Sequence, residues 1–202
     1  MSSVAARTRK EATRGAILTA ALQRFTHYGY RRTSMDDLAG AAGISRAAVY
    51  LHFKNKEDVF RALSEELQNA HLERAEEIAG EQAPIADRLR RVLREKLGVF
   101  TEIVAGSPHG AELLDENSRV CGDISLAAHR RFVRLIAGMV AEADAAGDLT
   151  LHRAGVKPAV AAELAYDWLR GVECAGLSAA ASQRRMDQAA RLLVIGLGGT
   201  AE

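Results

Sequence analysis

The sequence has little of what an exported or membrane-spanning protein needs. It contains two cysteines, Cys121 and Cys174, which are too few for a disulfide framework and fit a reducing compartment. No stretch approaches the roughly 18 consecutive apolar residues that a membrane-spanning helix needs. The charged residues of segment 7–11 stand where a signal peptide would have an apolar core. We therefore expect a cytoplasmic protein that has no membrane partner.

The sequence also lacks the signals of β-strands, because no runs of valine, isoleucine and threonine alternate with polar residues. Residues that favour helices, such as alanine, leucine, glutamate and arginine, are abundant. The three prolines, Pro84, Pro108 and Pro158, stand where helices would begin. The sequence therefore predicts an all-α fold of about nine helices, with a loop at 148–157. The predicted helices lie near 9–28, 35–42, 46–52, 56–79, 84–105, 108–118, 120–146, 158–181 and 185–198.

The net charge of +1 is an average over an uneven distribution. Residues 1–60 contain ten basic and five acidic side chains and carry +5, whereas the remainder contains 17 basic and 21 acidic side chains and carries −4. A basic segment on a mildly acidic body is typical of a phosphate-binding module joined to a regulatory or catalytic domain. A basic surface that is merely solvated is the alternative. The basic residues of segment 7–14 form either a disordered tail or an arm that reaches flanking DNA.

The segment after the first long helix carries the signals of two short helices joined by a turn. Ser34 and Asp37 form a capping-box-like start for the first of them. Gly43 allows a sharp turn, and Ser45 can cap the second helix. Asn55 can cap the long helix that follows. These signals predict a helix-turn-helix, although a plain helical hairpin gives the same pattern.

The second short helix divides into an inner and an outer face. Val49 and Phe53 face inward, which leaves polar and small side chains outside. In a helix-turn-helix this helix lies in the major groove, where Arg46 can form two hydrogen bonds to guanine and Ala47 can contact a thymine methyl group. Other side chains are placed for phosphate contacts, which position a protein on DNA without reading its sequence. The predicted phosphate contacts are Tyr50, His52, Lys54 and Lys56.

Residues 33–57 closely resemble the signature of the TetR family of transcriptional regulators, and the similarity extends over roughly 12–62. Its most specific part is the ending Val49-Tyr50-x-His52-Phe53-x-Asn55-Lys56-Glu57. The resemblance implies an all-helical homodimer with a DNA-binding domain at 1–55 and an effector-binding and dimerisation domain at 56–202. Carried over by position, the DNA contacts are Ser45, Arg46, Ala47, Tyr50, His52 and Lys56, with Thr33 and Ser34 at the DNA backbone.

One position departs from the family pattern. Asp36 stands where some relatives have a basic residue that reads a base. We therefore expect no base reading from the first short helix.

Two apolar helices close the sequence, near 158–181 and 185–198. Their stripes resemble the pair of helices that forms a four-helix dimer interface in the family. The alternative is an intramolecular core, which must also use much of the stripe. A two-fold dimer presents two recognition helices to a palindromic operator, which favours the dimer.

The helices between 84 and 146 are expected to enclose a mainly apolar pocket for a small hydrophobic or aromatic effector. Each candidate taken alone is more typical of core packing than of ligand contact. The candidate lining residues are Phe100, Ile103, Val104, Arg119, His129, Phe132, Met139, Tyr166 and Trp168.

The sequence indicates neither an enzyme nor a cofactor. The spacing of His109, Cys121, Asp123 and His129 matches no compact zinc pattern, so we expect no metal site. The sequence predicts a ligand-responsive regulator, a repressor that a small-molecule effector releases from a palindromic operator. The competing classes are a ligand- or metal-binding protein with a vestigial DNA head, and a structural DNA-organising protein.

Overall fold

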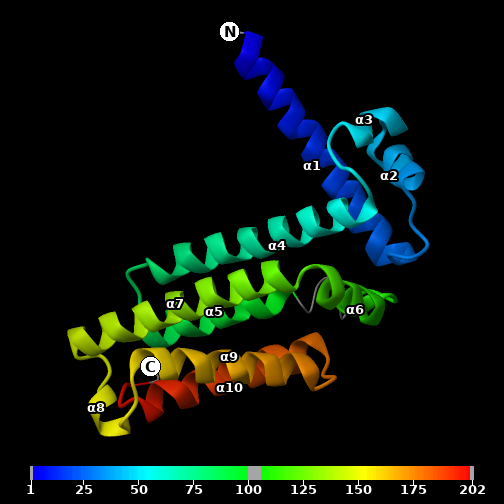
Figure 1. The fold of residues 1–202 in the computed structure, drawn as a ribbon. Helices are drawn as coiled ribbons and strands as arrows, with labels where there is room; N and C mark the ends of the chain where they lie inside the picture. Colours follow the sequence, from blue (N-terminus) through cyan, green and yellow to red (C-terminus); the bar gives the residue numbers. More distant parts are fainter. Residues whose placement is uncertain (1, 100–105, 201–202) are drawn as a thin grey trace. The chain divides into compact units, whose positions relative to one another are not determined.

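A computed structural model describes residues 2–99 and 106–200, which form ten α-helices and no β-strand (Figure 1). The predicted all-α fold is therefore confirmed. Within these ranges no helix combines the length and the apolar character needed to cross a membrane. The helices are α1 (Ser2–Tyr28), α2 (Met35–Ala42), α3 (Arg46–Tyr50), α4 (Lys56–Ala79), α5 (Ile85–Val99), α6 (Gly110–Val120), α7 (Gly122–Ala146), α8 (Leu151–Ala154), α9 (Pro158–Cys174) and α10 (Ala179–Gly196).

Several helix boundaries differ from the prediction. Helix α1 begins at Ser2, so the basic stretch near the N-terminus is helical and not an irregular tail. Helix α8 occupies the predicted loop 148–157, because the buried Leu151 donates its N–H to the Asp144 carboxylate at 2.9 Å. Helix α9 ends early, since Gly176 has a φ of 63° that does not continue a helix. Ser178 then caps α10.

The chain forms two compact units. The first comprises residues 1–67 and 106–124, and the second comprises 68–105 and 125–202. The predicted domain boundary between residues 55 and 56 stays a prediction. Helix α4 contributes residues to both units.

The first unit is built around three aromatic rings. Phe25 of α1 lies 5.5 Å from the Tyr30 ring and 5.5 Å from the Phe60 ring, measured between centroids. Val49 and Phe53 are 0% and 3% exposed in the same core, so the predicted inner face of the second short helix is confirmed. This core fixes α2 and α3 against α1.

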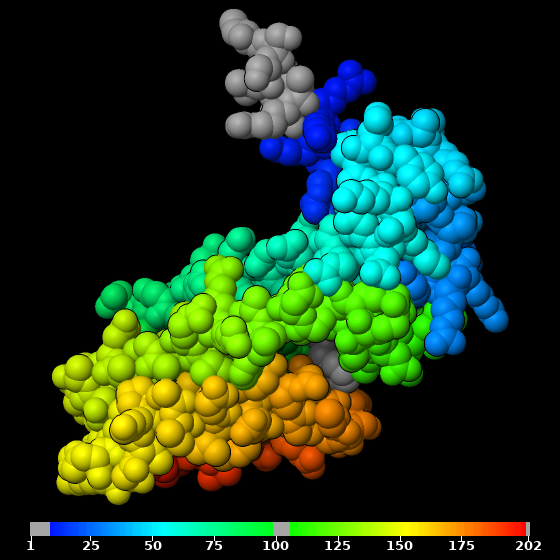
Figure 2. Space-filling view, in the orientation of Figure 1, coloured from blue at the N-terminus to red at the C-terminus, as the bar shows by residue number. Residues whose placement is uncertain are grey.

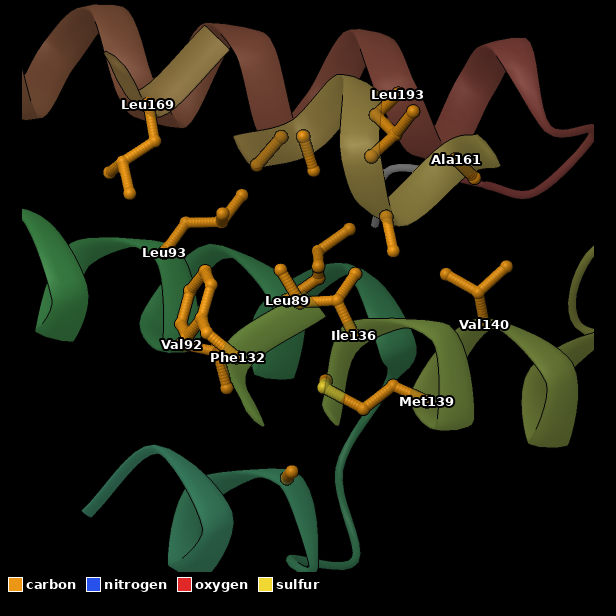
Figure 3. Packing of buried hydrophobic residues seen from close by; sticks show 14 of the residues in the cluster. Leu89, Val92, Leu93, Phe132, Ile136, Met139, Val140, Ala161, Leu169 and Leu193 are labelled. Carbon is orange, nitrogen blue, oxygen red and sulfur yellow. The ribbon is translucent and has the colours of Figure 1, made fainter. Parts of the chain in front are cut away.

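The core of the second unit is apolar and draws on six helices, α4, α5, α7, α8, α9 and α10, and Figure 3 shows part of it. Leu89 and Leu93 of α5 and Phe132 of α7 are at most 1% exposed. Helix α9 contributes Leu169, which is fully buried, and α10 contributes Leu193. Much of the predicted stripe of the two terminal helices therefore serves an intramolecular core.

Candidate nucleic-acid interface

Helix α2 begins with a complete capping box. The Ser34 hydroxyl oxygen accepts from the Asp37 N–H at 3.1 Å, and the Asp37 carboxylate accepts from the Ser34 N–H at 2.9 Å. Arg24 of α1 pairs with the same carboxylate at 3.0 Å. The hydrogen bonds from Ser34, and then the Arg24 charge, hold the pKa of Asp37 below its usual range. The predicted start of α2 is confirmed, and Arg24 ties it to α1.

A left-handed residue joins α2 to α3. Gly43 has a φ of 68°, and its N–H donates to the carbonyl of Gly40 at 3.2 Å. A side chain at Gly43 would strain this turn, which explains the glycine. The Ser45 hydroxyl then accepts from the Ala48 N–H at 3.1 Å and caps α3, as predicted. The chain therefore makes a tight turn directly before α3.

Most predicted DNA contacts lie on the surface of the first unit, where the segment around α3 is drawn in cyan (Figure 2). The exposed ones are Ser34, Ser45, Arg46, Ala47, Tyr50 and Lys54, and the half-buried ones are His52 and Lys56. Thr33 differs from the other candidates, because it is 1% exposed and its hydroxyl donates to the Gly29 carbonyl at 2.8 Å. The structure does not bring its side chain to the surface.

Lys56 faces the loop between α1 and α2. Its Nζ donates to the carbonyls of Tyr30 at 2.7 Å and Arg31 at 3.3 Å, and lies 4.3 Å from the centre of the Tyr30 ring. Burial lowers the pKa of Lys56, while the charges of Glu116 and Glu112 oppose the shift. In this structure Lys56 therefore fixes the α1–α2 loop.

Sequence reasoning missed two features beside the predicted contacts, the ion pair of Asp36 and the exposure of Leu51. Asp36 of α2 forms an ion pair with Arg46 of α3 at 2.5 Å. Leu51 follows α3 and is 79% exposed, more than any other large apolar side chain among the described residues. Leu51 stands two residues from each of the inward Val49 and Phe53, which places it on the opposite side of a helix. This spacing was a signal that could have identified Leu51 as exposed. No local signal links Asp36 to Arg46.

Helix α6 belongs to the same unit and contacts the loop between α1 and α2. The Glu112 carboxylate accepts from the Arg31 N–H at 2.7 Å. Gly29 has a φ of 85°, a conformation that other residues rarely adopt, and an added Cβ would lie 2.5 Å from Glu112 Oε2, so Glu112 would have to shift. The Tyr30 hydroxyl bonds to Glu116, and burial together with this carboxylate raises the pKa of Tyr30 to about 12.

The raised pKa of Tyr30 predicts a loss of stability at high pH. The pKa in the folded protein, about 12, exceeds the ordinary value of 10.0, so the contribution of Tyr30 is complete below pH 10 and falls as the pH rises towards 12. We expect the Tyr30→Phe variant to lack a phenolate transition near pH 12 in an ultraviolet absorbance titration. Replacing the exposed Tyr50 by phenylalanine should leave that transition in place, and its persistence in Tyr30→Phe would contradict the assignment.

The second unit brings together only some of the predicted effector-pocket residues. His129 and Phe132 of α7 lie 4.2 Å and 6.2 Å from the ring of Tyr166 on α9. Met139 packs in the core with Phe132, whereas Trp168 is 37% exposed. Phe100, Ile103 and Val104 lie outside the described residues.

Arg119 belongs to the first unit, whereas the other described candidates belong to the second. It pairs there with Glu116 at 2.6 Å and Glu57 at 3.1 Å. The helix that carries it, α6, packs on the α1–α2 loop, which the helical periodicity alone did not reveal.

Two buried charges in the second unit were not predicted. Lys96 of α5 is 9% exposed, and its Nζ donates to the Gln68 side chain at 2.5 Å. Glu173 of α9 accepts from Arg170 at 2.6 Å. Burial lowers the pKa of Lys96 and raises the pKa of Glu173. Lysine and glutamate on a helix usually indicate a solvated face, so their burial could not be predicted from the sequence.

The described residues contain no group of three or more histidine, cysteine, aspartate or glutamate side chains that could hold a metal ion. Asp123 pairs with Arg61 at 2.7 Å, and Cys121 is buried.

Comparison with known proteins gives a consistent result. The model of bacterial regulatory proteins of the tetR family matches residues 17–63. The HTH-type transcriptional regulator TtgR of Pseudomonas putida is 32% identical over 166 residues, which are 74% of this chain and 77% of TtgR. The relatives are named transcriptional regulators and not enzymes.

Solved structures share the fold over almost the whole chain. A TetR-family regulator from Mesorhizobium loti has a TM-score of 0.72 at 20% identity and covers 93% of this chain and 97% of its own. SmeT, the repressor of the Stenotrophomonas maltophilia efflux pump SmeDEF, has a TM-score of 0.67 at 25% identity, with 92% and 90% covered. SmeT in complex with triclosan has a TM-score of 0.66 at 24% identity, with 93% and 90% covered.

Proposed function

Because the chain belongs to the TetR family of DNA-binding transcriptional regulators, we propose that it is a ligand-responsive repressor. Residues 1–55 bind a palindromic operator, and residues 56–202 bind a small-molecule effector and dimerise. The observation that supports this proposal most directly is the geometry of α3. This helix is capped by Ser45, follows the tight turn at Gly43 and exposes Arg46 and Ala47. A helix presented in this way fits the major groove of DNA.

The DNA contacts divide into two kinds. Arg46 reads guanine and Ala47 contacts a thymine methyl group. The remaining residues hold phosphates or the DNA backbone, which fixes the register of the protein on the duplex. These residues are Thr33, Ser34, Ser45, Tyr50, His52, Lys54 and Lys56. Thr33 would contribute through its backbone, since its side chain is buried.

A homodimer would cover the apolar surface of the last two long helices. Helix α9 exposes Val160, Leu164 and Trp168 at intervals of four residues, which places them on one side of the helix. Helix α10 exposes Leu192 and Ile195, at 64% and 50%. Exposed apolar residues grouped in this way are typical of a protein interface. In the dimer the two recognition helices would lie about 34–36 Å apart, one turn of DNA.

The effector would bind in the second unit beside the aromatic group of His129, Phe132 and Tyr166. The same unit holds the buried side chains of Lys96 and Glu173, so it suits a small, mostly apolar molecule that carries a polar group. SmeT, which shares the fold, is known in complex with the small molecule triclosan. Met139 and Trp168 are further candidates in this unit, whereas Phe100, Ile103, Val104 and Arg119 stay predictions from the sequence.

Release from DNA requires that the effector favours a state in which the two DNA-binding domains of the dimer no longer have the spacing that fits DNA. Helix α4 contributes to both units and is the candidate lever. A change from mostly bound to mostly free DNA needs an affinity difference on the order of 10⁴ between the two states.

A gel shift on the DNA flanking the gene of this protein tests the proposal. We expect a shifted band that a scrambled duplex of the same length does not compete away. Binding of equal strength to random DNA would favour a DNA-organising protein, and the absence of any operator binding at low salt would overturn the regulator. Mass analysis of ligand retained through purification tests the effector. We expect this ligand to dissociate the protein from the DNA, so that the shifted band disappears.

A further inference from the structure

We propose that Asp36 of α2 is a positioning residue for base reading, because its carboxylate holds the Arg46 guanidinium in place for one guanine. This inference rests on the proposed function, since it takes Arg46 as a reader of DNA sequence. It assigns the acidic side chain at the DNA surface a role in specificity, although Asp36 itself touches no base.

The geometry engages both ends of the guanidinium group. Arg46 Nη1 donates to Asp36 Oδ2 at 2.5 Å, and Arg46 Nη2 lies 3.5 Å from the Tyr50 hydroxyl oxygen. The guanidinium carbon lies 5.6 Å from the centre of the Tyr50 ring. A guanidinium has five N–H donors, so two contacts leave others for a base edge. Asp36 and Tyr50 therefore restrict Arg46 without consuming its hydrogen-bonding capacity.

Burial does not impose this arrangement. The side chains of Arg46 and Asp36 are 58% and 59% exposed, so each is free to turn towards solvent. An exposed arginine has many rotamers, and fixing one of them costs conformational entropy when DNA binds. A carboxylate that already holds the guanidinium reduces this cost for the correct geometry.

A carboxylate on a DNA-binding surface needs an explanation, because it repels phosphates. Stabilising the start of α2 is the simplest alternative, since Asp36 lies in the first turn. That position already has a complete capping box formed by Ser34 and Asp37. The only ion pair that Asp36 forms among the described side chains is with Arg46. The helix start is therefore secured by its neighbours, and Asp36 is available to Arg46.

Binding-site selection from randomised duplexes, followed by affinity measurement at each base pair, tests the proposal with the full-length protein. We expect the wild type to prefer guanine at one position of each half-site, and Arg46→Ala to lose that preference by about 5- to 150-fold. Asp36→Ala should weaken the same preference by about 2- to 5-fold, the contribution expected of an exposed ion pair. Its affinity for random DNA should stay equal or rise, because one negative charge is removed.

Two further variants complete the design. Asp36→Asn keeps a carbonyl acceptor and should retain more of the guanine preference than Asp36→Ala. Glu65→Ala removes one exposed negative charge from the same unit away from Arg46, and should leave the preference at every position unchanged. Thermal unfolding of each variant shows whether a loss of preference accompanies a loss of fold.

The outcomes separate this inference from the proposed function. An unchanged guanine preference in Asp36→Ala, with the preference lost in Arg46→Ala, overturns the role of Asp36 alone. A preference lost at a neighbouring cytosine means that Asp36 reads a base directly, which also overturns positioning. If Arg46→Ala keeps the guanine preference, Arg46 is not the reader and the inference fails. If the wild type has no sequence preference, the proposed function fails as well.

Discussion

Replacing Phe25 by alanine is expected to lower the free energy of unfolding of the first unit by about 3–5 kcal/mol, the usual cost of removing a buried aromatic ring. Phe25 is 1% exposed and packs against the rings of both Tyr30 and Phe60. The cavity would open between α1 and α4, which together support α2 and α3. Chemical denaturation measures the loss, and we expect operator binding to weaken with it.

Amide hydrogen exchange locates the effect. Phe25→Ala should accelerate exchange first in peptides from α1, α2 and α3, since local opening follows local packing. Phe132→Ala is the matched control, because Phe132 is fully buried in the core of the second unit. That variant should accelerate exchange in α5 and α7 first. If Phe25→Ala lowers the free energy of unfolding by less than about 1 kcal/mol, which is closer to the effect of a surface substitution, the assignment of Phe25 to the core is wrong.

The helix-turn-helix was predictable in detail because its signals are local. The Ser34–Asp37 box, the Gly43 turn and the Ser45 cap each act over three or four residues, and the structure contains all of them. The predicted bounds of α2 agree with the structure for the same reason. The Asp36–Arg46 pair was not predictable, because it depends on how α2 and α3 cross.

The second unit was less predictable because periodicity identifies apolar residues without saying what each one faces. The stripe predicted on α9 divides into Ala165 and Leu169, which are fully buried, and Leu164 and Trp168, which are exposed. Only the packing of neighbouring helices makes this distinction. The burial of Lys96 likewise depends on distant partners, since Gln68 belongs to another helix.

The exposed apolar residues of α9 and α10 lead to the prediction with the largest effect on DNA binding. Replacing Leu192, which is 64% exposed on α10, by arginine is expected to convert the proposed dimer into monomers. An unpaired charge in an apolar interface is costly to desolvate. Two linked heads bind two half-sites with an advantage of about 10²- to 10⁴-fold over a single head, so operator affinity should fall by a factor of that order. Sedimentation equilibrium and gel shift measure the two effects.

Leu126→Arg is the matched control for this experiment. Leu126 is also an exposed leucine on a helix, at 48%, but it lies on α7 and is not part of the proposed interface of α9 and α10. The same substitution there should leave both the molecular mass in solution and the operator affinity unchanged. A dimer that survives Leu192→Arg would show that these helices do not form the interface. Monomers that bind the operator as tightly as the wild type would show that the two heads do not act jointly. Because the two measurements respond separately, dimerisation and its contribution to DNA binding are tested independently.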